Sequence, residues 1–211
     1  MSADVTNFRL PWPDRDAIID AIWDYLSLRR WFPAGLKRSQ VRVLDYRELD
    51  DSRFRLLILE AQNVWYHLPL ALVSNWEGSG IAGRTICPQD TPYYLVDAPY
   101  YPEYVKYWLS LAHQSGTLPL LPEPEDFIPR LLEASETSTV LTGEQSNTSV
   151  LIRGKYPTII KFFRVLASGL NPEVSTPNAL AQTGWEGIPQ PIGSSFLHLW
   201  NQHDQPQEVT T

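Results

Sequence analysis

The sequence predicts an α+β protein in which an antiparallel sheet with flanking helices precedes a smaller β-rich unit. Three observations lead to this class. An early segment has helical periodicity, three strand-like segments follow with short polar turns between them, and the composition changes near Ala134. The predicted domains are therefore 1–133 and 134–211.

The first element is an amphipathic helix over about residues 14–29. Its apolar residues recur every four positions, and aspartates form the opposite stripe. These two sets are Ile18, Ile22 and Leu26 on one side, and Asp16, Asp20 and Asp24 on the other. Asp14 and Asp16 suit a helix start, and Pro33 stops the helix.

Three strands are expected next, in a meander. They span residues 41–49, 53–61 and 64–73, and short polar turns between such runs favour antiparallel pairing. Pro69 has no amide hydrogen to donate, so it is expected on an edge strand or at a bulge. Residues 84–86 and 93–96 extend the sheet.

The remaining chain alternates between helices and strands. The predicted helices cover residues 102–115, 125–133 and 173–183, and the predicted strands cover 150–152, 158–163 and 194–200. Pro177 has to lie in the first turn of its helix, because elsewhere it would break it. The tail from residue 201 lacks an apolar pattern and is predicted to be a loop.

The composition excludes several classes of protein. With 43% hydrophobic and 19% charged residues, the chain of 211 residues should fold around a core. A formal charge of −7 argues against nucleic-acid binding, because such a surface repels phosphates. An unbroken apolar run long enough for a bilayer is missing, as is a signal-peptide pattern, so we expect no membrane association and a cytoplasmic location. Cys87, the one cysteine, is expected to be a buried free thiol, and the histidines lack metal-ligand spacing.

Lys161 is the residue whose position most suggests chemistry. It lies in the middle of an apolar strand, so its ammonium must reach outward or meet an anion. A polar turn over residues 143–149 precedes it, and backbone amides in such a turn can bind phosphate. Bilobal kinases place a strand lysine against phosphate in a similar way.

The segments GEQSNTSVLI, IIKFFR and NPEV, followed by IPQPIG, are similar to the nucleotide lobe of bacterial maltokinases and of trehalose synthase–maltokinase fusions. The segments WDYLSLRRWFPAG, VRVLDY and LPLAL resemble the cap domain that precedes that lobe. The resemblance covers about residues 20–195. It implies a maltokinase-like cap domain over 1–133 and a partial protein-kinase-like N-lobe over 134–211.

The resemblance also implies a function. Maltokinases use ATP and Mg²⁺ to convert maltose to maltose 1-phosphate, which feeds glycogen and trehalose metabolism. The cofactor-binding residues implied for this chain are Gln145, Ser146, Asn147, Thr148 and Ser149 in a phosphate-covering loop, with Lys161 as the phosphate lysine. No catalytic residue and no metal ligand is assigned.

Two departures from the family pattern bear on activity. Ser175 stands where the family has a glutamate that pairs with the strand lysine, and Glu173 would point to a nearly opposite side of the helix. After Lys161 the only aspartate is Asp204, so a catalytic loop and a metal-binding segment are missing. We therefore expect this chain to be inactive alone. Its expected partner is a kinase C-lobe, another protein or a second copy, through an apolar patch at 158–163 and 196–200.

Two alternatives remain open. One is a stand-alone, non-catalytic regulatory or protein-interaction module that keeps the kinase-derived fold. The other is a sugar-binding domain that uses Tyr104 and Trp108, although one helical face carries both and core packing is the better interpretation. Trp31 and Phe32 are likewise expected to pack the first helix onto the sheet.

Overall fold

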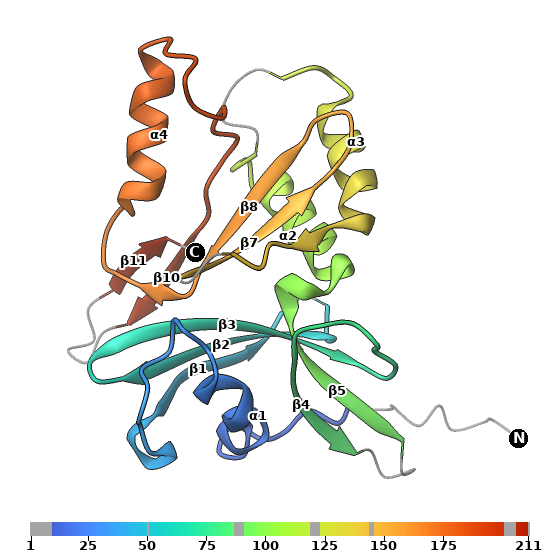
Figure 1. The fold of residues 1–211 in the computed structure, drawn as a ribbon, viewed down its shortest axis with the longest axis vertical. Coiled ribbons are helices and arrows are strands. Elements are labelled where there is room, and N and C mark those ends of the chain that lie inside the picture. The colour runs from blue at the N-terminus through green and yellow to red at the C-terminus, as the bar shows by residue number, and fades with distance from the viewer. Residues whose placement is uncertain are drawn as a thin grey trace, which may run out of the picture.

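A computed structural model describes residues 10–49, 51–86, 91–118, 123–143, 146–200 and 206–210. Within these ranges the protein is a mixed α+β fold with antiparallel sheets and four α-helices, as the sequence predicts (Figure 1). The α-helices are α1 (Ile18–Ser27), α2 (Pro102–Gln114), α3 (Phe127–Ala134) and α4 (Pro172–Gln182), and the short 3-10 helices are η1 (Arg38–Gln40), η2 (Ala98–Tyr100) and η3 (Ser135–Thr137). The strands are β1 (Arg42–Glu48), β2 (Phe54–Ala61), β3 (Val64–Val73), β4 (Ile81–Ile86), β5 (Pro92–Asp97), β6 (Thr139–Val140), β7 (Asn147–Ile152), β8 (Thr158–Phe163), β9 (Val165–Leu166), β10 (Phe196–Trp200) and β11 (Pro206–Thr210).

The first sheet, called the cap sheet below, has the order β1-β2-β3-β5-β4, and β9 also pairs with β3. All its pairs are antiparallel, which confirms the predicted meander and its extension by the next two strands. Gln62 and Asn63 connect β2 to β3 with positive φ angles of 54° and 63°. A two-residue hairpin needs this left-handed backbone, and asparagine adopts it readily.

Helix α1 covers one face of the cap sheet (Figure 1). Its predicted apolar stripe is confirmed, because Ile18, Ile22 and Leu26 are all fully buried. The helix is shorter than predicted and begins only after a turn at residues 15–17. Gly83 on β4 lets the helix lie close, since a Cβ there would be 2.1 Å from the carbonyl oxygen of Ala21.

Pro69 lies in a central strand, so the prediction of an edge or bulge position is wrong. Strand β3 pairs with β2 on one side along its whole length. On its other side, β9 pairs at Trp65 and Tyr66 and β5 pairs at Leu70–Val73. Pro69 lies between the residues that pair with β9 and those that pair with β5. No described neighbouring strand accepts a hydrogen bond at this position, so the lack of an N–H group costs nothing.

The second sheet has the order β6-β7-β8 and packs against α2 and α3. The ring centroid of Tyr104 on α2 lies 5.2 Å from that of Phe54 in the cap sheet and 6.0 Å from that of Phe162 on β8. The predicted core role of this aromatic face is therefore confirmed. One apolar cluster includes residues from both sides of the boundary predicted at 133/134.

Two predictions in the C-terminal part are wrong. Helix α4 continues through Pro177, which is its sixth residue and not in its first turn. The carbonyl group that loses its partner belongs to Glu173, an exposed residue, so water can supply the missing hydrogen bond. Residues 206–210 form β11, antiparallel to β10, although a loop was predicted; backbone pairing orders a segment that has no apolar pattern.

The predicted apolar patch on β8 is mostly core. Thr158, Ile160, Phe162 and Phe163 are buried, and Ile159 is the exposed apolar residue of this strand. In β10, Phe196 and Leu197 are half-buried, and the side chains of 198–200 lie outside the described residues. A homodimer through this region stays a prediction. In the described ranges, every helix is too short or too polar to cross a membrane.

Candidate functional site

Lys161 lies on the outward face of β8. Its neighbours Ile160 and Phe162 point into the core, while its own side chain is 43% exposed. Its cross-strand partner in β7 is Ser149, and directly opposed residues of an antiparallel pair share a face of the sheet. The predicted outward position of the ammonium group is therefore confirmed.

The Lys161 ammonium meets a carboxylate, but not at the position that the family pattern suggests. Its Nζ atom lies 3.0 Å from Oε2 of Glu173, in the first turn of α4. The other oxygen, Oε1, accepts a hydrogen bond of 3.1 Å from Nδ2 of Asn147. Glu173 thus links the second sheet to α4.

The prediction that Glu173 points away from Lys161 is wrong. Which side of a helix meets the sheet depends on how the helix packs, and α4 packs with Glu173 toward β8. Asn171 fixes the helix start, because its side-chain oxygen accepts the backbone N–H of Glu173 at 2.9 Å. A carboxylate in the first helical turn also interacts favourably with the helix dipole.

The predicted phosphate-covering loop is divided between a loop and a strand. Asn147, Thr148 and Ser149 belong to β7, while Ser146 lies exposed just before it. Gln145 lies outside the described residues, as does Cys87. Because successive side chains of a strand alternate, Asn147 and Ser149 share the face of Lys161, and Thr148 points the other way.

Ser149 lies on the same face of the second sheet as Lys161 but differs from it in burial. Its side chain is fully buried, and its hydroxyl oxygen has no hydrogen-bond partner in the described part of the chain. The polar side chains of this face that solvent reaches are Lys161 and Asn147.

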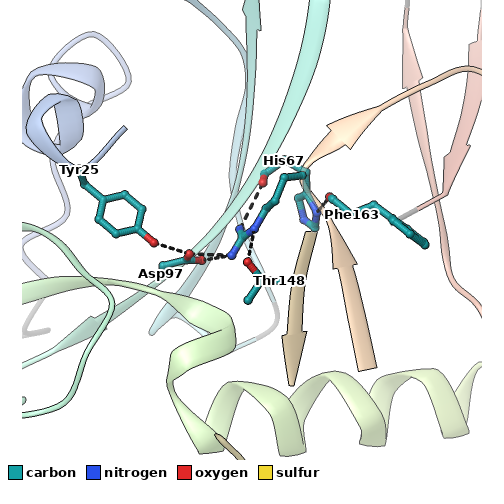
Figure 2. Close-up of polar contacts among 6 residues, drawn as sticks. Tyr25, His67, Asp97, Thr148 and Phe163 are labelled. Atoms are coloured by element: carbon teal, nitrogen blue, oxygen red, sulfur yellow. Dashed lines mark hydrogen bonds and ion pairs between the residues drawn. The ribbon is translucent and has the colours of Figure 1, made fainter. Parts of the chain in front are cut away.

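On the opposite face of β7, a buried network connects the second sheet to the cap sheet and to α1 (Figure 2). Arg164 follows β8 and is fully buried. Its Nη2 atom donates to both carboxylate oxygens of Asp97, at 2.8 and 2.6 Å. Tyr25 on α1 donates its hydroxyl hydrogen to Oδ2 of the same carboxylate at 2.6 Å. Two fully buried charges are thereby neutralised by each other.

Arg164 reaches two further strands. Its Nε atom donates to the Thr148 hydroxyl on β7 at 2.8 Å, and Nη1 donates to the carbonyl of His67 on β3 at 3.3 Å. The guanidinium carbon also lies 5.4 Å from the ring centroid of Trp31. The sequence reasoning missed this network. Its signal was an arginine and an aspartate each placed among apolar strand residues, where an unpaired charge is costly.

Burial sets the protonation states around Arg164. Burial, followed by the charge of Arg164, lowers the pKa of His67 from its ordinary 6.5 to about 3. The neutral ring then donates from Nδ1 to the carbonyl of Phe163, at 3.3 Å. Burial also raises the pKa of Tyr25 well above its ordinary value, with the Asp97 charge as the next cause, so its hydroxyl stays a donor.

Within the described ranges, the acidic, histidine and cysteine side chains form no group of three or more that could hold a metal ion. No protein-family model matches the sequence.

Proposed function

We propose that this chain supplies the cap and the nucleotide-binding lobe of a maltokinase-like, ATP-dependent sugar kinase. The observation that carries the proposal is the ion pair of 3.0 Å between Lys161 on a sheet strand and Glu173 on the following helix. In protein kinases a strand lysine and a helix glutamate pair in this way, and the pair has to be in place for phosphoryl transfer.

The order of the surrounding elements supports the proposal. A polar hairpin precedes β7, β8 carries Lys161, α4 carries Glu173, and two further antiparallel strands follow. Protein-kinase lobes also place a phosphate-covering loop before the lysine strand. Ser149 lies opposite Lys161 in the β7–β8 pairing, so the polar turn leads directly into the strand that faces the lysine.

Each residue then has a defined task. Lys161 binds phosphate oxygens through its ammonium group, Glu173 holds that ammonium in place, and Asn147 holds Glu173. ATP with Mg²⁺ would supply the phosphoryl group, and the resemblance names maltose as its acceptor. We propose that a kinase C-lobe contributes the carboxylates that orient the attacking hydroxyl and bind magnesium.

Calorimetric titration with ATP and Mg²⁺ tests the proposal. We expect the wild-type chain to bind and Lys161→Ala to bind about tenfold more weakly or not at all, since a charged contact is lost. Lys155→Ala is the matched control, because Lys155 is an exposed lysine near the β7–β8 turn that pairs with Asp126 instead. Equal binding by all three proteins, or no binding by the wild type, would contradict the proposal. The second result would favour a non-catalytic interaction module.

A further inference from the structure

Strand β7 carries neighbouring residues that belong to two different hydrogen-bond networks. Asn147 faces outward and donates to Glu173 at 3.1 Å. Thr148 faces inward and accepts from Nε of Arg164 at 2.8 Å. The two side chains lie on opposite faces of one strand, so a shift of this strand moves both.

The inward network is anchored in the cap. Arg164 binds Asp97 at the end of β5, and Asp97 in turn binds Tyr25 on α1. The exposed fractions of Arg164 and Asp97 are 0% and 1%. A fully buried guanidinium has fixed donor directions and no water to replace a lost partner, so it determines where its acceptors lie.

Arg164 is also close along the chain to the outward network, since it lies just three residues after Lys161. It therefore fixes the end of β8 directly and the start of β7 through Thr148. These are the strand positions from which Lys161 and Asn147 reach Glu173.

We propose that Arg164 is a positioning residue for the phosphate site. Through Thr148 it holds Asn147 where Asn147 can fix Glu173 against Lys161, and Asp97 and Tyr25 of the cap hold Arg164. The cap thereby sets the geometry of the nucleotide lobe. This inference rests on the proposed function of Lys161.

The test compares Thr148→Val with Thr148→Ser. Valine has the shape of threonine but cannot accept a hydrogen bond from Arg164, whereas serine keeps the hydroxyl. Thr158→Val is the matched control, because Thr158 is a buried threonine on β8 whose hydroxyl donates to the carbonyl of Tyr156, at the far end of the sheet.

Two readouts are needed. The first is the affinity for ATP and Mg²⁺, which we expect to fall roughly two- to thirty-fold in Thr148→Val and to stay near wild type in Thr148→Ser and Thr158→Val. The second is the NMR signal of the Asn147 side-chain amide, assigned by its loss in Asn147→Asp. We expect this signal to move in Thr148→Val in the direction seen in Glu173→Gln, and to stay in place in the serine and control variants.

The two readouts separate the two proposals. If the wild type does not bind ATP, the function proposed for Lys161 fails, and the amide signal alone decides whether Arg164 positions Asn147. An unmoved amide signal in folded Thr148→Val, or an equal movement in Thr158→Val, would overturn the positioning role. If Thr148→Val does not fold, Tyr25→Phe replaces it, because this variant removes only the outermost hydrogen bond. A smaller movement of the amide signal in the same direction supports the inference, and the absence of any movement overturns it.

Discussion

Two ion pairs are made by residues only three positions apart, Lys161 on β8 and Arg164 just after it, and the two pairs differ in their exposure to solvent. Arg164 and Asp97 are 0% and 1% exposed, whereas Lys161 and Glu173 are 43% and 45% exposed. The buried pair has lost its water, so every remaining donor needs a protein partner. The exposed pair keeps part of its hydration and is screened by salt.

This difference in burial suits the Arg164–Asp97 pair to a structural role and the Lys161–Glu173 pair to ligand binding. The buried pair cannot open without leaving an unpaired charge in an apolar core, so it suits a permanent connection between the cap sheet and the second sheet. The exposed pair can exchange partners at low cost, because water and ions replace what each group loses. An anionic ligand can therefore compete for Lys161 but not for Arg164.

The largest expected effect comes from breaking the buried pair. Arg164→Met leaves Asp97 buried without a counter-charge, and we expect the free energy of unfolding to fall by about 3–5 kcal/mol. Urea denaturation followed by fluorescence measures this. The double variant Arg164→Met, Asp97→Asn removes the stranded charge and should recover part of the loss. A double variant less stable than Arg164→Met would show that the charge is not what destabilises the single variant.

Between pH 6.5 and 5, a smaller effect on stability is expected through His67, which lies beside the same arginine. Its pKa is lowered from 6.5 to about 3 in the fold, so the unfolded chain takes up a proton that the folded chain does not. Stability from this group is complete above pH 6.5 and falls as the pH drops toward 3, by at most about 1.4 kcal/mol per pH unit. Unfolding measured between pH 6.5 and 5 avoids most carboxylate titration.

The comparison that isolates His67 uses two variants. His67→Gln keeps a neutral donor for the carbonyl of Phe163 and should flatten the dependence on pH over this interval. His113→Gln changes an exposed histidine and should retain the slope. A slope that survives in His67→Gln would assign the effect to another group.

The smallest effect on stability is expected at the exposed pair. Glu173→Gln and Lys161→Ala should each change the free energy of unfolding by about 0–1 kcal/mol, and by less in high salt. Denaturation at two salt concentrations measures this. A loss as large as that of Arg164→Met would remove the distinction between the two pairs.

Sequence reasoning found most elements because their signals are local. Alternation along β3 and the helical stripe of α1 both reflect burial of one face, which a short window of residues records. The tail strand β11 was missed because its order comes from pairing with β10, and its own residues have no such pattern. Pro69 was misplaced because the interruption of pairing beside β3 depends on β9, a distant segment.

In the candidate site, too, the local feature was predicted from sequence and the long-range contacts were not. The outward direction of Lys161 follows from its apolar neighbours and was predicted correctly. Its partner was not, because the approach of α4 to the sheet depends on the chain between them. Arg164 and Asp97 could not be joined from sequence alone, since the two residues are 67 positions apart and many charged residues lie between them.

That separation has a consequence for how the protein is made. A ribosome releases Asp97 well before Arg164, so the newly synthesised cap carries an aspartate whose partner has not yet been translated. Chains that pause between these residues hold a cap that lacks both its buried counter-charge and strand β9. The cap sheet can therefore be completed only after the second sheet has been synthesised.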